Sequence, residues 1–370
     1  MVVMLPTHQH WDALAAAEGL PPTASNIAKV GKKFGDEPSR WAFEQWTLRE
    51  RARIKFALAD QMLFTRTGLE MSTHERTAAF HASLFGDAPV ADLTCGIGAD
   101  LIALAKRGPT RGFDIDPIHV SYAQHNLKVH GLEAEVSVVD ASAYEGTDCL
   151  MIDPARRSGR VRTLDPDQFS PTLTSAFELA NRAPSAVIKL SPMLPDELLE
   201  QPNSKLIFVS HKGECCEALI VFGEEGRGAV HVESGEFLES EPIDLTVDEP
   251  DKYIYAADPA AIRAGCLGSF EAEALGDSNG YLTSSDLLQS PWLASFELIW
   301  SGKWHEKQVQ EVIRTEGLKL EAVKTRGVQI DPAKVMKSLK PGGKDTAVLL
   351  LYCIGKSIRA IVAKRISNLP

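Results

Sequence analysis

Hydrophobic and polar positions follow two different periods along this 370-residue chain. Within residues 1–85 apolar positions recur at helical spacing, most clearly over 41–65, a stretch without Gly or Pro. From residue 89 onward, short apolar runs alternate with amphipathic segments of helical length. The expected strands are residues 89–93, 110–115, 134–139, 148–152, 185–190, 206–210 and 217–222. Strands separated by helices predict an α/β domain whose mostly parallel sheet carries helices on both faces.

The last two expected strands are joined by the short turn His211-Lys212-Gly213, which predicts an antiparallel hairpin that closes the sheet. After this hairpin the sequence becomes acidic and rich in Gly and Ser, and then shows a separate order of strands and helices with two strands flanking Gly355. We therefore expect four parts: an N-terminal helical region (1–85), the sheet domain (86–223), a connecting α+β segment (224–295) and a C-terminal α+β domain (296–370).

Charge is distributed unevenly between these parts. The net charge is −11, yet residues 296–370 contain 14 Lys and Arg against 7 Asp and Glu, a net +7 that leaves −18 for the rest. Such asymmetry suggests a module that faces a polyanion, although a solvated basic domain without such a partner explains it as well. A smaller basic cluster, Arg49 to Lys55, suits the charged face of a helix or a contact to phosphate.

Several classes of protein are disfavoured by composition. The six cysteines are scattered without a Cys-x-x-Cys pair, so we expect neither disulfides nor a bound metal. No apolar run reaches the ~18–20 residues of a membrane span, and the N-terminus lacks the pattern of a secretory signal. We expect a reduced, cytoplasmic protein without a membrane partner.

The first expected strand runs into a turn with two glycines, which reads Asp92-Leu93-Thr94-Cys95-Gly96-Ile97-Gly98. Glycines let a backbone pass close to a ligand. The third glycine of the dinucleotide fingerprint is replaced by Leu101, and Asp92 suits a positively charged ligand better than a phosphate. S-adenosylmethionine, with a sulfonium, an amino group and no phosphate, therefore fits better than NAD. The residues expected to contact it in this turn are Asp92, Thr94, Cys95, Gly96 and Gly98.

Two further acidic residues follow the next two strands. Asp114, 22 residues after Asp92, ends the second strand beside Ile115, where its carboxylate can accept both hydroxyls of a ribose. Asp140 follows the third strand, where it can accept from an adenine amino group while Ala141 offers its backbone N–H. The carboxyl ends of parallel strands meet at one edge of a sheet. The three carboxylates thus predict one cofactor site.

These motifs resemble a bacterial family of class I S-adenosylmethionine-dependent methyltransferases, with a Rossmann-like sheet and a C-terminal THUMP-like domain. The matching segments are 92–100, 112–117, 153–157, 253–265 and 340–344, so the resemblance covers nearly the whole chain. The run from Asp114 to Gly131 is also similar to trimethylguanosine synthases and to several RNA base methyltransferases. The resemblance implies an RNA-directed role, because THUMP domains in other enzymes bind RNA.

The expected catalytic residues lie at the ends of the fourth and fifth strands. Enzymes that methylate exocyclic amines of bases often have Asn, Asp or Ser here, followed by Pro-Pro and an aromatic residue. This chain keeps Asp153-Pro154 but has Ala155 and Arg156 in the next positions. Asp153 is suited to orient an N–H or take its proton, and Arg156 to pair with phosphate or stack on a base. A capped turn and surface ion pairs are the structural alternative. Lys189 is either a substrate contact or a structural lysine.

Three hypotheses about function remain open at this point. The leading one is a methyltransferase that acts on RNA, either tRNA, rRNA or a guanosine base. A second is a methyltransferase for a small molecule or a protein, whose C-terminal module serves assembly. The third is a non-catalytic RNA-binding protein on a methyltransferase scaffold, which the complete set of glycines and aspartates disfavours. The acceptor atom, the class of RNA and the oligomeric state do not follow from the sequence.

Overall fold

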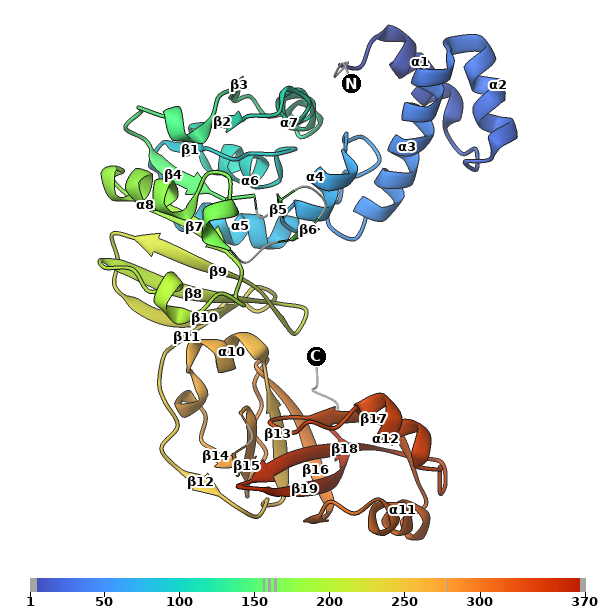
Figure 1. Ribbon diagram of the computed structural model, residues 1–370, viewed down its shortest axis with the longest axis vertical. Coiled ribbons are helices and arrows are strands. Elements are labelled where there is room, and N and C mark those ends of the chain that lie inside the picture. Colours follow the sequence, from blue (N-terminus) through green and yellow to red (C-terminus); the bar gives the residue numbers. More distant parts are fainter. Residues whose placement is uncertain (1–4, 156, 159–160, 163–164, 278, 367–370) are drawn as a thin grey trace. The chain divides into compact units, whose positions relative to one another are not determined.

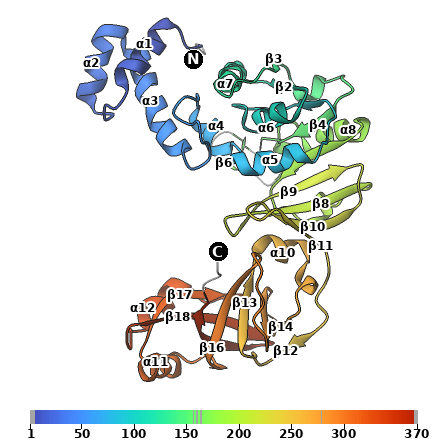
Figure 2. The same cartoon turned by 180° about the vertical axis from the view of Figure 1, so that it is seen from behind.

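The computed structural model describes residues 5–155, 157–158, 161–162, 165–277 and 279–366 (Figures 1 and 2). The chain divides into two compact units. The first contains the residues up to Leu190, with 194–204 and 219–224, and the second contains 191–193, 205–218 and the residues from Glu225 onward. No helix among the described residues is long and apolar enough to span a membrane.

The first unit begins with five helices: α1 (His8–Ala17), α2 (Ala24–Phe34), α3 (Asp36–Ala52), α4 (Arg66–Met71) and α5 (Glu75–Ser83). Helices α1, α2 and α3 share a small apolar core, and the end of α3 joins the larger core beneath the sheet. The helical pattern predicted over 41–65 was wrong beyond Ala52, where the chain continues in turns. These turns bury Phe56, Ala59 and Met62 in the same core, so their apolar spacing reflects packing rather than a helix.

The basic cluster on α3 is used within the protein. The guanidinium of Arg49 is buried and donates to the backbone carbonyl of Met62 at 2.9 Å. Arg53 forms an ion pair with Asp60 at 2.9 Å. Lys55 donates to the backbone carbonyls of Leu69 and Ser72 at 2.9 and 2.6 Å, which fixes the end of α4. These contacts favour the structural interpretation of the cluster over a phosphate contact.

The sheet of the first unit confirms the predicted α/β class. Its strands are β1 (Val90–Asp92), β2 (Thr110–Asp114), β3 (Glu135–Val138), β4 (Cys149–Ile152) and β7 (Ala186–Leu190), in the parallel order β7-β4-β1-β2-β3. Helices α6 (Ala99–Arg107) and α7 (Pro117–Val129) pack side by side over β2, and α8 (Leu173–Arg182) packs on β7. The short elements are η1 (Ala141–Ala143), β5 (Arg157–Ser158), β6 (Val161–Arg162), η2 (Pro166–Gln168) and α9 (Asp196–Leu199).

The predicted hairpin is formed by β8 (Ser204–His211) and β9 (Glu214–Phe222). The two turn residues, Lys212 and Gly213, both have positive φ angles of 53° and 76°, as a two-residue hairpin turn prefers. Strand β9 is a neighbour of β7 in the sheet, and β8 is a neighbour of β9. Two short strands follow in the second unit, in the segment expected to be α+β: β10 (Gly226–His231) and β11 (Glu236–Glu239), with β10 parallel to β8.

The rest of the second unit is built on one eight-stranded sheet in the order β12-β14-β15-β13-β16-β19-β18-β17. The strands are β12 (Thr246–Val247), β13 (Tyr253–Ala257), β14 (Glu273–Leu275), β15 (Tyr281–Ser284), β16 (Leu293–Lys303), β17 (Leu318–Thr325), β18 (Asp345–Ile354) and β19 (Ser357–Arg365). The helices are α10 (Pro259–Ala264), η3 (Leu267–Ser269), α11 (Glu306–Thr315) and α12 (Pro332–Ser338). Side chains of α11 and α12 cover one face of the last four strands.

Candidate cofactor and methyl-transfer site

A cavity of about 300 Å³ lies within the first unit, where β1, β2, β3 and β4 end. The predicted site residues that line it are Thr94, Cys95, Gly96, Asp114, Ile115, Asp140, Ala141 and Asp153. Four predicted residues, Asp92, Gly98, Pro154 and Lys189, lie outside the lining set. Arg156 lies outside the described residues.

The two glycines of the first turn have different surroundings. Gly96 has a φ of 53°, and a Cβ at this position would meet nothing within 4 Å, so the glycine keeps the cavity wall open. Gly98 has a φ of 91° and begins α6, where a Cβ would lie 3.2 Å from Ala123 of α7. Gly96 therefore faces the site, whereas Gly98 permits the helix packing behind it.

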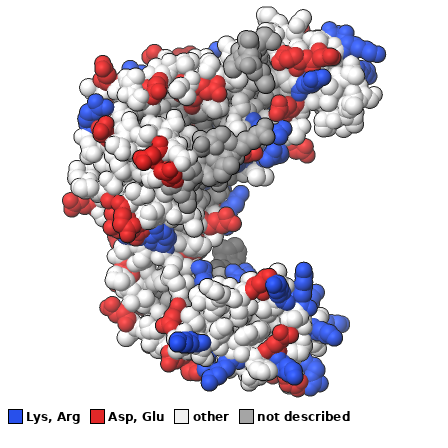
Figure 3. Space-filling model, in the orientation of Figure 1, with Lys and Arg blue, Asp and Glu red and all other residues white. Residues whose placement is uncertain are grey.

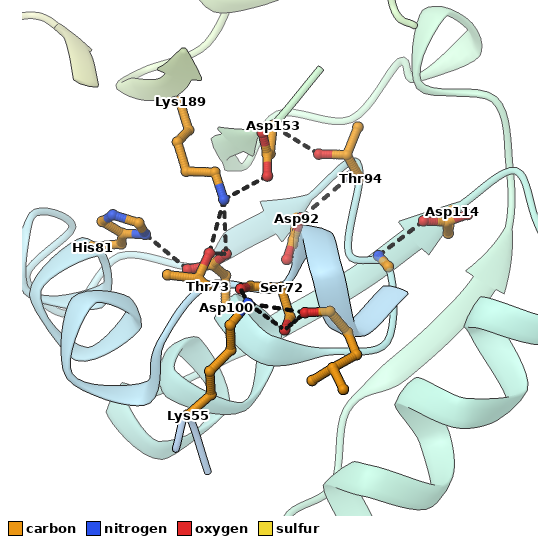
Figure 4. Close-up of polar contacts among 12 residues, drawn as sticks. Lys55, Ser72, Thr73, His81, Asp92, Thr94, Asp100, Asp114, Asp153 and Lys189 are labelled. Carbon is orange, nitrogen blue, oxygen red and sulfur yellow. Dashed lines mark hydrogen bonds and ion pairs between the residues drawn. The ribbon is translucent and has the colours of Figure 1, made fainter. Parts of the chain in front are cut away.

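Asp114 organises the floor of the cavity. One carboxylate oxygen accepts from the backbone N–H of Gly96 at 2.8 Å, and the other accepts from the N–H of Asp116 at 2.8 Å (Figure 4). The imidazole of His119 lies 3.4 Å from the second oxygen. Burial alone would raise the pKa of Asp114, but His119 and the two N–H donors outweigh it and the net shift is downward. The carboxylate stays charged and can still accept hydroxyl donors.

Asp92 lies behind the lining rather than in it. Its side chain is 2% exposed and accepts from the N–H of Thr94 at 3.2 Å. Burial, and then the charge of Asp100, raise the pKa of Asp92 well above its usual value. The hydroxyl of Thr94 in turn accepts from the backbone N–H of Asp153 at 2.7 Å. Asp92 and Thr94 thus connect the ends of β1 and β4.

The side of the cavity beyond β3 combines a capping carboxylate with apolar surface. Asp140 is exposed and begins the short helix η1, where one oxygen accepts from the N–H and hydroxyl of Ser142 at 2.9 and 2.7 Å. These hydrogen bonds lower the pKa of Asp140. Ile115 is 63% exposed at the cavity, which leaves an apolar plate beside Asp140 and Ala141 that suits an aromatic base.

A connected set of buried and partly buried polar residues lies where β4 and β7 end (Figure 4). The ammonium of Lys189 lies 2.5 Å from the carboxylate of Asp153 and donates to the hydroxyl of Thr73 at 2.8 Å. Thr73 donates to Asp100 at 2.6 Å, and Nδ1 of His81 donates to the other oxygen of Asp100 at 2.7 Å. The sequence motifs did not point to Thr73, His81 and Asp100, nor to His119.

The charge of the cavity wall tests which ligand fits. Five aspartates line it, and the described lining residues include neither Lys nor Arg. A phosphate would meet repulsion from these carboxylates, whereas a sulfonium and an ammonium group would be stabilised. The lining therefore fits S-adenosylmethionine and not a dinucleotide. Among the described residues, no group of three or more His, Cys, Asp or Glu is placed to hold a metal ion.

Comparison with known proteins agrees with this geometry. Over 99% of the chain, the fold matches a crystal structure from Porphyromonas gingivalis W83 that is provisionally named a methyltransferase, with 100% of that chain covered, 19% identity and a TM-score of 0.77. The chain has a class I methyltransferase fold. Two uncharacterised S-adenosylmethionine-dependent methyltransferases of Mycobacterium tuberculosis, from strains H37Rv and CDC 1551, are each 29% identical to it. Each alignment spans 343 residues, which is 87% of this chain and 95% of the relative.

The C-terminal part has its own match. Residues 293–365, from the start of β16 to the end of β19, match the family described as THUMP domain-like. The family resemblance, the fold class, the enzyme class and the cofactor that we predicted from the sequence are confirmed by these findings. The roles of the individual site residues and the nature of the substrate stay predictions.

Proposed function

We propose that this methyltransferase transfers the methyl group of S-adenosylmethionine to RNA. The observation that carries the proposal is the THUMP-like match over residues 293–365, in a region where Lys and Arg outnumber Asp and Glu by 14 to 7. THUMP domains in other enzymes bind RNA, and Lys and Arg supply the phosphate contacts on which nucleic-acid affinity depends. Figure 3 shows many Lys and Arg side chains over the C-terminal part of the chain.

One basic cluster in this domain is crowded enough to favour an anionic partner. It consists of Lys324 and Arg326 at the end of β17 and Arg365 at the end of β19. Burial, and then the charges of Arg365 and Arg326, lower the pKa of Lys324. Arg365 pairs with Glu321 at 3.1 Å, and Lys324 has no ion pair among the described residues. A phosphate placed here would relieve the repulsion among the three cations.

The catalytic step asks little of the protein beyond position and charge. S-adenosylmethionine, when bound, supplies a methyl group that is already activated on a sulfonium. In this proposal Asp114 and Asp140 hold the nucleoside part through its hydroxyls and amino group. Asp153 accepts a hydrogen bond from the acceptor N–H and takes its proton as the methyl group is transferred. Lys189 keeps the Asp153 carboxylate in place.

The test is incubation of the purified protein and methyl-labelled S-adenosylmethionine with RNA from a strain that lacks the gene. We expect label in RNA, located by digestion and mass spectrometry, and no label with an Asp153→Asn variant. Label in protein, or in small molecules of the same extract, with none in RNA would favour the second hypothesis. Tight cofactor binding without any transfer would favour the non-catalytic hypothesis.

The basic cluster is tested separately by RNA affinity at several salt concentrations. Lys324→Ala and Arg326→Ala should weaken binding and reduce the slope of log Kd against log salt by about 0.7–0.9 for each phosphate that the variant no longer binds. Lys32→Ala, an exposed lysine near the end of α2, is the matched control and should leave the slope unchanged. Equal slopes for all three variants would remove the cluster from the proposed RNA contact.

A further inference from the structure

Thr73 and Asp100 line the cavity and lie beside the ammonium of Lys189, and His81 contacts Asp100 from within the core. Thr73 precedes α5, His81 belongs to α5 and Asp100 lies in the first turn of α6. We propose that these three residues form a positioning unit for methyl transfer, which holds Lys189 and, through it, the carboxylate of Asp153. The inference rests on the proposed role of Asp153 and assigns part of the catalytic machinery to the N-terminal helices.

The ammonium of Lys189 is fixed from more than one direction. Its side chain is only 11% exposed, so protein groups supply most of the partners of its ammonium. It reaches Asp153 at 2.5 Å and Thr73 at 2.8 Å, and one oxygen of Asp100 lies 3.9 Å away. A nearly buried ammonium needs such partners, because desolvation otherwise disfavours its charge. Its position, and with it the orientation of Asp153, therefore depends on Thr73 and Asp100.

Thr73 acts through both functions of its hydroxyl. The oxygen accepts from Lys189 at 2.8 Å, and the hydroxyl hydrogen is donated to Asp100 at 2.6 Å. A hydroxyl provides one donor, so this pair of contacts fixes its rotation. Thr73 thereby links the ammonium of Lys189 to the carboxylate of Asp100. Asp153 stays the closer carboxylate, at 2.5 Å against 3.9 Å for Asp100.

His81 and Asp100 form the base of the unit. The side chain of His81 is 0% exposed, and its contact to one oxygen of Asp100 leaves the other oxygen facing Thr73 and Lys189. Burial alone would raise the pKa of Asp100, yet His81 and Lys189 outweigh burial and the net shift is downward. Asp100 therefore stays charged, and it shares the ammonium with Asp153 so that Asp153 remains available to a substrate N–H.

Substitution of Thr73 gives the sharpest test, because Val lacks only its hydroxyl group and Ser lacks only its methyl group. Thr73→Val keeps the shape but loses the hydroxyl, and Thr73→Ser keeps the hydroxyl. We expect Thr73→Val to lower kcat at least ~10-fold with the KM for S-adenosylmethionine changed less than about threefold. Thr73→Ser should retain at least roughly a third of the wild-type kcat. Equal rates for both variants, or a parallel loss of cofactor affinity, would overturn the proposal.

The pH–rate profile separates positioning from a purely structural role. Lys189→Met leaves Asp153 near the carboxylates of Asp92 and Asp100 without the ammonium, so the acidic limb should move to higher pH. Asp100→Asn removes a carboxylate that competes with Asp153 for the ammonium, so that limb should move to lower pH. Asp60→Asn, on an exposed turn, is the control and should move neither limb. Shifts in the same direction for both site variants would contradict the shared ammonium.

A measurement without any acceptor keeps this inference independent of RNA as substrate. In protein labelled with ¹³C at the aspartate carboxyls, the resonance of Asp153, assigned with Asp153→Asn, should change position in Thr73→Val and His81→Gln. It should keep its wild-type position in Thr73→Ser and Asp60→Asn. An unchanged resonance in all four variants would refute the positioning unit, even if RNA is the substrate. If RNA is not the substrate, the spectra still show whether Thr73 and His81 position the carboxylate of Asp153.

Discussion

Replacement of Asp114 by Asn tests the cofactor site most directly. The change keeps the size of the side chain but turns one accepting oxygen into an NH₂ donor. In the protein each oxygen already accepts a backbone N–H, from Gly96 and from Asp116, both at 2.8 Å. The amide must therefore place its NH₂ against one of these donors. The turn loses one hydrogen bond in every orientation of the amide.

The magnitude follows from these contacts. A buried donor left without its acceptor costs about 1–3 kcal/mol, which should lower the stability of the free protein. A carboxylate that accepts ribose hydroxyls contributes about 1.5–3 kcal/mol more than a poorly placed amide, equivalent to a Kd that rises roughly 10- to 100-fold. We expect Asp114→Asn to show both effects, and Asp140→Asn, whose carboxylate is exposed, to show a smaller one.

The assay is isothermal titration with S-adenosylhomocysteine, accompanied by thermal unfolding without ligand. Melting in the absence of ligand reports the missing hydrogen bond in the turn, and the titration reports the weakened hold on the nucleoside. A Kd within about twofold of the wild-type value would show that Asp114 does not bind the cofactor. An unchanged Kd with a lowered Tm would assign Asp114 to the shape of the turn alone.

Three further predictions concern residues that line the cavity or lie directly behind it. The hydrogen bond to Asp114 and its charge raise the pKa of His119 despite burial. The stability that protonated His119 contributes is therefore present below pH ~6.5 and is lost as the pH rises through its folded-state pKa. The Tm difference between wild type and His119→Asn should shrink between about pH 6 and pH 9. Gly96→Ala should weaken cofactor binding in a titration, whereas Gly98→Ala should mainly lower the Tm, since both angles are strained but only Gly98 has a close neighbour. Burial raises the pKa of Asp92, so the folded chain loses stability as the pH rises above ~4. Asp92→Asn should therefore unfold at a higher Tm than wild type at about pH 8 and at the same Tm near pH ~4. A lower Tm of the variant at about pH 8 would refute this explanation.

The predictable part of the molecule is the part whose signals are local. The order of strands and helices, the Gly-bearing turn and the acidic residue at the end of β2 follow from patterns a few residues long. The end of α3 at Ala52 could not be predicted, because Phe56 and Ala59 keep helical spacing while they pack in turns. The segment that contains β10 and β11 was expected to be α+β, but its short Gly-rich and acidic stretches did not give the bounds of these strands or their place in the sheet.

The missed site residues have a different cause. Thr73 and His81 lie before the first strand, in a region whose periodicity indicates only helices, and their partner Asp100 looks like an ordinary acidic residue in the first turn of a helix. The contacts of Thr73 to Lys189 and to Asp100 join positions 116 and 27 residues apart in sequence, a relation that no local pattern encodes. These three residues could be predicted only if it were known which helices pack against the carboxyl ends of the strands.

The structure also separates two roles that a sequence motif presents as one. Asp92 and Gly98 belong to the same turn as Gly96, but neither lines the cavity. Asp92 shapes the turn through Thr94, and Gly98 permits α6 to approach α7. The shape of the turn and the contact with the ligand thus depend on different residues of one motif. An intact motif indicates that the cavity can form, and the residues that line the cavity determine which ligand binds. For this chain the acidic and basic residues among them are five aspartates and one histidine, which is why a cationic cofactor fits and a phosphate does not.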